Sequence, residues 1–188
     1  RRWRKEGRLQ CLLSALRRTV RREEGRKGEP SALIVDCQSV ATSRTGGISS
    51  YDAYKNVKGR KRHLAVDTEG LPWNVLVHAA GDHESRWALQ VLTPIRGRTD
   101  RDKTVFADSA YRGLEGEIKN KLDWTLDIVE REDEDSGFSV DPKRWIVERT
   151  FSWLGGWRRL NRDYERKTDT SETMVRAALL RIALNRLS

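Results

Sequence analysis

The sequence predicts an α/β fold in which a mixed sheet carries helices on its faces. Short apolar runs rich in β-branched residues alternate with segments of helical periodicity. The polar turn Asp67-Thr68-Glu69-Gly70 joins two of these runs, and a turn closed by glycine indicates an antiparallel hairpin. Helical segments separate the later runs, as they do where strands run parallel. We therefore expect three antiparallel strands leading into parallel ones.

A basic amphipathic segment begins the chain. Over residues 8–22 apolar side chains recur at helical spacing among arginines, which predicts a helix. Gly25, Gly28 and Pro30 then indicate a linker. The sequence is accordingly divided into residues 1–29, a basic helix and linker, and residues 30–188, one α/β domain.

Strands and helices are expected in a definite order within residues 30–188. The expected strands are 32–35, 63–66, 73–78, 104–107 and 124–129. The expected helices are 83–92, 114–122, 142–160 and 171–187. Pro94 is expected to limit the first of these helices, and a capping box of Asp169 and Glu172 is expected to open the last.

The composition indicates a polyanionic partner. The formal net charge is +9, with 35% charged and 37% apolar residues. A basic field concentrates phosphates at a surface, so nucleic acid is the expected partner. No apolar stretch approaches the ~20 residues that span a bilayer, so no membrane association is expected. Cys11 and Cys37 form no disulfide framework, and a reducing cytoplasm is the simplest compartment for the chain.

The positive charge gathers in three regions of the sequence. These are residues 1–30, the run 55–62 and the segment 143–167. Two interpretations of the run 55–62 stay open. It is either a solvated loop, the usual fate of a charge run, or a contact with phosphates beside a functional site.

Two aspartates follow apolar strands, at the edge where open α/β sheets place their ligands. Asp36 follows the run 33–35, and Asp108 follows the run 105–107. If these strands are neighbours, the two carboxylates converge and repel each other unless a cation lies between them. Mg²⁺ prefers oxygen ligands, and two such ions roughly 3.5–4 Å apart can activate the attacking oxygen and stabilise the leaving one in phosphoryl transfer.

Glu148 is the best candidate for a third carboxylate. On the helix expected at 142–160 it shares a face with Arg144, and Val147, Phe151 and Leu154 form an adjoining apolar face that can pack on the sheet. Glu148 would then lie at the margin of this packing, near a strand-end aspartate. The alternative is a solvated ion pair with Arg144, which contributes only about 0.3–0.5 kcal/mol.

Four stretches of the chain carry a family resemblance. They are residues 34–40, 58–68, 107–113 and 144–154, which include Ile34-Val35-Asp36-Cys37, Lys58-Gly59-Arg60-Lys61-Arg62-His63, Ala107-Asp108-Ser109-Ala110-Tyr111 and Ile146-Val147-Glu148-Arg149. In this order they resemble bacterial insertion-sequence DDE transposases, and more narrowly the insertion-sequence-five group. The similarity runs from about Pro30 to the C-terminus.

The resemblance implies a ribonuclease-H-like fold with a catalytic, metal-binding triad of Asp36, Asp108 and Glu148. It implies two Mg²⁺ ions, for which Mn²⁺ can substitute, and strand cleavage followed by strand transfer that moves an insertion sequence. Its partners would be double-stranded DNA, both element ends and target, bound by a homodimer in the bacterial nucleoid. Residues 1–29 would be the remnant of an N-terminal DNA-binding region. The cations expected to contact DNA are Lys58, Arg60, Lys61, Arg62, Arg112, Arg144, Arg149, Arg158 and Arg159.

Several other residues are expected to have structural roles. Asp67 fits an ordinary hairpin turn. The histidines His63, His78 and His83 have no zinc-like spacing with the cysteines, so packing or surface roles are expected. Core packing is expected for Trp145, Trp153 and Trp157, and stacking on a base of an opened DNA end is the alternative.

Two rival functions stay open at the level of sequence. One is a truncated, catalytically inactive transposase remnant that only binds DNA. The other keeps the fold and cuts DNA without joining it. Cleavage in Mg²⁺ separates the enzymes from the remnant, and joining separates a transposase from a nuclease.

Overall fold

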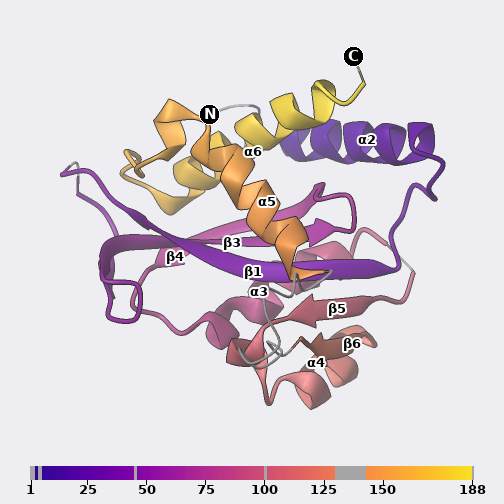
Figure 1. Ribbon diagram of the computed structural model, residues 1–188, viewed down its shortest axis with the longest axis horizontal. Helices are drawn as coiled ribbons and strands as arrows, with labels where there is room; N and C mark the ends of the chain where they lie inside the picture. Colours follow the sequence, from indigo (N-terminus) through magenta and orange to yellow (C-terminus); the bar gives the residue numbers. More distant parts are fainter. Residues whose placement is uncertain (1–2, 4–5, 45, 100, 130–142, 188) are drawn as a thin grey trace, which may run out of the picture.

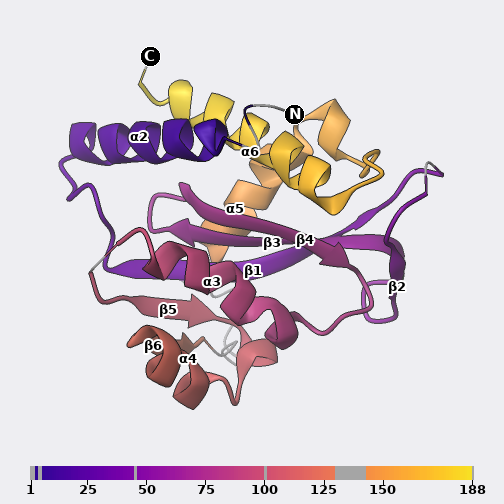
Figure 2. The same cartoon turned by 180° about the vertical axis from the view of Figure 1, so that it is seen from behind.

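A six-stranded mixed sheet forms the centre of the molecule, with helices over both faces (Figures 1 and 2). The computed structural model describes residues 3, 6–44, 46–99, 101–129 and 143–187. The strand order is β2-β3-β1-β5-β6, and β4 also pairs with β3. The strands are β1 (Ala32–Ala41), β2 (Ser50–Asp52), β3 (Val57–Asp67), β4 (Pro72–Ala79), β5 (Thr104–Ala107) and β6 (Thr125–Ile128).

The strand directions confirm the predicted sheet. β1, β3 and β4 pair antiparallel, whereas β1, β5 and β6 pair parallel. The predicted hairpin joins β3 to β4, and the Asp67 carboxylate accepts the backbone N–H groups of Glu69 and Leu71, both at 3.0 Å. Asp67 therefore has the structural role expected of it.

Each face of the sheet has its own apolar layer. The helices after the hairpin are α3 (Ala88–Arg96), α4 (Glu115–Leu122), α5 (Arg144–Gly155) and α6 (Thr168–Leu184), with short 3₁₀ turns η1 (Glu84–Trp87), η2 (Ser109–Tyr111) and η4 (Arg158–Leu160). Leu33 and Val35 of β1 join the core under α3 and α4, and Ile34 joins the core under α5 and α6. This is the alternation that a strand buried on both faces requires.

The basic N-terminal helix α2 (Arg8–Glu23) lies beside α6 (Figure 1). Its Val20 is buried with Leu71 and Ala183. Two arginines of α2 are buried as well. The Arg17 guanidinium lies 3.5 Å from the centre of the Trp73 ring, and Arg21 Nη1 lies 3.0 Å from Asp67 Oδ2. The helix thus packs on the β3–β4 turn, which belongs to the domain predicted at residues 30–188.

The β1–β3 pair depends on one glycine. A Cβ atom on Gly59 would lie 1.9 Å from the Val40 carbonyl oxygen, so no other residue allows the strands to approach this closely. Beyond Gly59 the strand carries Arg60, Lys61 and Arg62 into the interior, where they are 0%, 7% and 2% exposed.

Two strand predictions are wrong. β1 continues past Asp36 to Ala41, because β3 supplies backbone partners along that whole length. The strand expected at 63–66 begins already at Val57, so only Lys55 and Asn56 of the run 55–62 lie outside β3. Both extensions carry polar side chains, which do not give the apolar pattern of a buried strand. They are buried only because distant parts of the chain supply their partners.

Helix boundaries differ from the predictions in three places. α3 runs through Pro94 to Arg96, because Ile95 is fully buried and packing outweighs the proline. α5 ends at Gly155, well before residue 160. The predicted capping box is absent from α6, which begins at Thr168; Glu172 instead accepts the Val77 N–H at 3.2 Å. The acidic stretch before α5, including the predicted helix start at Pro142, lies outside the described residues.

Candidate catalytic carboxylate site

Asp36 and Asp108 lie on neighbouring parallel strands. Phe106 pairs with Ile34, so continuing the register by two residues sets Asp108 beside Asp36. Asp108 follows the end of β5 and turns the chain into η2, where its Oδ1 accepts the Ala110 N–H at 3.0 Å. Asp36 lies within β1, just past the last residue that pairs with β5, so its edge of the strand is open there.

The electrostatics of Asp36 indicate a site with excess negative charge. The pKa of Asp36 is raised to about 7, mainly by burial and in addition by the charges of Asp108 and Glu84. The Cys37 N–H, which donates to Asp36 Oδ1 at 2.7 Å, and the charge of Lys55 act in the opposite direction. A divalent cation would relieve this repulsion, and carboxylate oxygens are suitable ligands for Mg²⁺. The residues present therefore fit the implied metal.

Glu84 is a further acid at this place that the sequence did not single out. Ligand atoms of Asp36, Cys37 and Glu84 all lie within 4.8 Å of one another. Burial raises the pKa of the Cys37 thiol, so it stays protonated at neutral pH and is a weak ligand. Glu84 opens the turn η1, and acids are common in the first turn of a helix for electrostatic reasons alone, which concealed this position.

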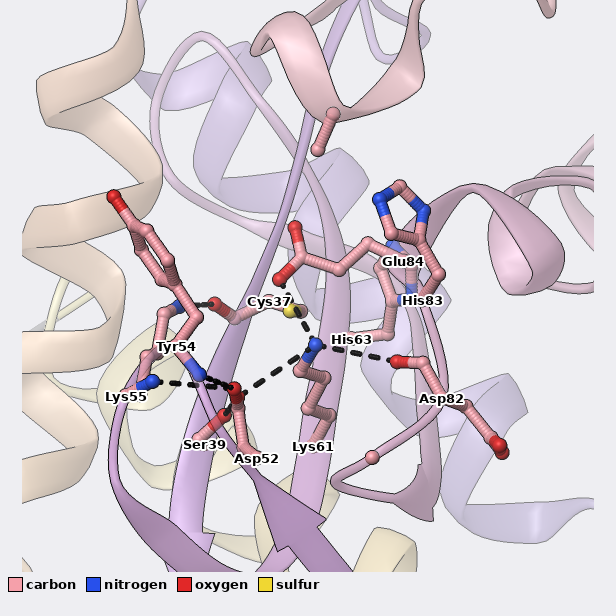
Figure 3. Close-up of polar contacts among 12 residues, drawn as sticks. Cys37, Ser39, Asp52, Tyr54, Lys55, Lys61, His63, Asp82, His83 and Glu84 are labelled. Carbon is pink, nitrogen blue, oxygen red and sulfur yellow. Dashed lines mark hydrogen bonds and ion pairs between the residues drawn. The ribbon is translucent and has the colours of Figure 1, made fainter.

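Lys61 holds Glu84 through a buried network (Figure 3). Its Nζ lies 3.3 Å from Glu84 Oε1 and 3.7 Å from Asp52 Oδ2, and it donates to the Asp82 carbonyl at 3.2 Å. Burial acts to lower the pKa of Lys61, but the charges of Glu84 and Asp52 raise it above its usual value. Lys61 is thus a structural cation that orients the acids around Asp36.

A buried histidine and tyrosine complete the inner side of the site. Tyr111 and His63 are joined by a hydrogen bond of 2.5 Å between Oη and Nε2. Burial lowers the pKa of His63 to about 3 and raises that of Tyr111, so both are neutral near pH 7. His63 and His78 are both buried, in agreement with the packing roles expected of them.

Glu148 lies on the outer side of α5. Val147 and Phe151 of this helix pack in one core with Ile34, two residues before Asp36. The Glu148 side chain is 56% exposed and lies 3.2 Å from Arg144 Nη2. This is the ion pair considered as the alternative to catalysis, and the role of Glu148 as the third carboxylate stays a prediction.

The cations expected to contact DNA fall into three groups by burial, and Lys61 belongs to the buried group. Arg60 and Arg62 are buried and bind inside the protein: Arg60 contacts Asp163 at 3.2 Å, and Arg62 donates to the Leu160 carbonyl at 2.7 Å. Arg144 and Arg149 are half-buried on α5. The exposed members are Lys58, Arg112, Arg158 and Arg159.

The tryptophans of the α5 region differ from their expected roles. Trp145 and Trp157 are 38% and 37% exposed, so the prediction of core packing is wrong for these two. The Arg149 guanidinium lies 4.3 Å from the Trp145 ring centre and 4.8 Å from that of Trp153. These rings flank a cation near the surface and are accessible to a ligand.

A mixed sheet in which antiparallel strands lead into parallel ones, with helices over both faces, is that of the ribonuclease-H-like class. Residues 27–183 match the model of the transposase DDE domain family, and the chain belongs to this family. It is also 26% identical, over 93% of its own length and 88% of the relative's, to a Burkholderia cepacia protein whose name assigns it to the insertion sequence element IS402 as a transposase. No helix in the described part of the chain has the length and apolar character to cross a membrane.

Proposed function

We propose that this DNA transposase domain cuts and rejoins phosphodiester bonds with two divalent cations held by Asp36, Asp108 and Glu148. The observation that supports this most strongly is the parallel register of β1 and β5, which brings Asp36 and Asp108 to neighbouring positions, together with the raised pKa of Asp36. Such repulsion is costly in a fold unless a cation is part of its working state. The family assignment supplies DNA as the substrate class.

In this proposal some side chains hold the cations, and others keep those side chains in position. When bound, the cations would supply activation of the attacking oxygen and stabilisation of the leaving oxygen. Asp36 and Asp108 offer carboxylate oxygens from rigid strand positions. Glu148 can join them by giving up Arg144, a partially exposed pair whose loss costs little. Lys61 keeps Glu84 in place beside them.

DNA would lie across the open edge of β1 and the outer face of α5. The candidate phosphate contacts are Arg144 and Arg149 of α5, Arg158 and Arg159 of η4, Lys58 of β3 and Arg112 at the end of η2. Phosphate contacts from such residues fix the position of DNA without reading its sequence.

We further propose that the ion is Mg²⁺, that the protein binds DNA as a homodimer in the nucleoid, and that it is a member of the insertion-sequence-five group. Residues 1–29 would be the remnant of a DNA-end-binding region.

A nicking and joining assay with labelled element ends tests the proposal. Wild type is expected to cleave in Mg²⁺ or Mn²⁺, and Asp36→Asn, Asp108→Asn and Glu148→Gln are each expected to lose cleavage while retaining DNA binding. Asp127→Asn is the matched control, because Asp127 is an exposed carboxylate on the adjacent strand β6. Binding without cleavage by wild type in either metal would favour the inactive remnant, and cleavage without joining would favour a nuclease.

A further inference from the structure

The turn between β2 and β3 lies next to the candidate catalytic site. It consists of residues 53–56, which we call the β2–β3 turn. Lys55 reaches from it to β1, where its Nζ donates to the Cys37 carbonyl at 3.3 Å. Lys55 is also close enough to Asp36 for its charge to act on that carboxyl. The turn is therefore adjacent to the place where the scissile phosphodiester would lie.

Asp52 holds this turn in a fixed shape (Figure 3). Its Oδ1 accepts the N–H groups of Tyr54 at 3.1 Å and Lys55 at 3.2 Å, and its Oδ2 accepts the Ser39 hydroxyl at 2.6 Å. Burial acts to raise the pKa of Asp52, but these hydrogen bonds and the charge of Lys61 hold it below its usual value. The clamp is thus ionised, and at the far end of the turn Asn56 takes a left-handed conformation with φ of 52°.

Tyr54 is presented by this rigid turn without contributing to the core. Its side chain is the most exposed of the large hydrophobic residues in the described part of the chain, at 93%. In Figure 3 its ring points away from the Lys61 network. Two exposed cations, Lys55 and Lys58, follow it closely in the sequence. An exposed aromatic ring with cations in the same turn and strand start matches the chemistry of a nucleotide, with a base for the ring and phosphates for the lysines.

We propose that Tyr54 stacks on an unpaired base of the DNA strand that enters the candidate catalytic site. The inference rests on the proposed function, since it takes DNA as the substrate. Lys55 would contact the adjacent phosphate and so set the stacked base close to Asp36. Because Asp52 fixes the turn before DNA arrives, little conformational entropy is lost on binding.

Binding and base stacking are measured without cleavage, in Ca²⁺, by titrating a short duplex with a single-stranded overhang that carries 2-aminopurine. Tyr54→Ala is expected to weaken binding of the overhang substrate by about 5- to 150-fold, the range that loss of one base–aromatic stack implies. It should also abolish the quenching of 2-aminopurine. Blunt duplex should bind Tyr54→Ala and wild type equally. The side chain is almost fully exposed, so the variant is expected to keep its thermal stability.

Tyr54→Phe and Tyr54→Leu are the matched variants that distinguish stacking from general apolar contact. Phe is expected to retain affinity and quenching, and Leu to lose both. Wild-type behaviour of Tyr54→Ala, or equal rescue by Leu and Phe, overturns the inference and leaves the proposed chemistry intact. Conversely, a wild type that shows quenching through Tyr54 yet never cleaves in Mg²⁺ supports the inference and contradicts the proposed function. If the wild-type protein binds neither the overhang substrate nor the blunt duplex, both the inference and the proposed function are overturned.

Discussion

Asp36 lies near two other acids in a partly desolvated position, and its ionisation therefore opposes folding of the metal-free protein. The ordinary pKa of Asp is 3.8, and in the folded chain that of Asp36 is about 7. The folded state consequently holds a proton between these pH values that the unfolded state has lost. The free energy of unfolding therefore falls as the pH rises through this window, by roughly 1.4 kcal/mol for each unit of pKa difference. Above the window it is constant.

Replacing Asp36 with Asn should therefore stabilise the metal-free protein at pH 8 and have little effect at pH 4. Urea unfolding in a chelator measures this difference, which we expect to be on the order of a few kcal/mol. Addition of Mg²⁺ at pH 8 should stabilise wild type but not Asp36→Asn, because the cation binds the ionised carboxylates. Asp127→Asn serves again as the exposed control. Equal pH dependence in wild type and Asp36→Asn would show that Asp36 is not under electrostatic strain.

Single residues were predictable where strand geometry alone fixes them. Asp36 and Asp108 could be paired from sequence, because the ends of parallel strands meet at one edge of a sheet. Glu84 was not predictable, since it enters from a short turn after β4. Glu84 comes close to Asp36 only when β1, β3 and η1 have packed together in the folded chain. Tyr54 likewise had no periodic signal in the sequence.

At the scale of elements, β3 is both strongly basic and largely buried, and the sequence shows only the first of these features. Its basic run reads as a polyanion-binding segment, but the run lies in a strand covered by other parts of the chain. Arg60 donates to the carbonyls of Ile48, Glu165 and Arg166 and pairs with Asp163. Composition cannot tell a buried arginine with internal acceptors from an exposed one, because the acceptors lie far away in sequence.

Arg60→Met should destabilise the fold by about 3–5 kcal/mol, because the buried Asp163 carboxylate loses its paired cation and keeps only the hydrogen bonds from Glu165 N–H and the Ser171 hydroxyl. Arg159→Met is the matched control. This variant removes the ion pair between Arg159 and Glu165. Because the Arg159 side chain is 56% exposed, the free energy of unfolding should fall by at most about 1 kcal/mol.

The two arginine variants should differ in their effect on DNA binding. Fluorescence anisotropy with duplex DNA is expected to show weaker binding for Arg159→Met, and unchanged affinity for the folded fraction of Arg60→Met. Unfolding in urea provides the stability comparison. Weaker DNA binding by a fully folded Arg60→Met would restore the interpretation of the run 55–62 as a phosphate contact.

For the whole molecule, the fold class and the family could be derived from sequence. The fold class follows from the alternation of apolar runs and helical segments, which depends on local periodicity, and the family follows from the resemblance of four stretches of the chain. Boundaries were less predictable wherever distant contacts decide them, as at Pro94 in α3 and at Glu172 in α6. The packing of α2 against α6 and the β3–β4 turn is a further long-range feature, whereas the sequence suggested a separate basic region.

Removal of α2 tests whether this helix is part of the domain. A chain that begins at residue 27, where the family match starts, loses the Arg17–Trp73 contact and the Arg21–Asp67 pair. Its urea midpoint should fall below that of the full chain, and Arg21→Ala should lower it in the same direction. An unchanged midpoint for both would mean that α2 adds nothing to the stability of the domain, as expected of a remnant of another region.

The convergence of three carboxylates on divalent cations is tested most directly by a crystal structure of the protein with Mn²⁺, recorded with anomalous diffraction. We expect two anomalous peaks beside Asp36 and Asp108, with the Glu148 side chain turned from Arg144 toward one of them. Peaks bound by Asp36 and Glu84 alone, or no peaks with Glu148 still paired with Arg144, would contradict the proposed triad.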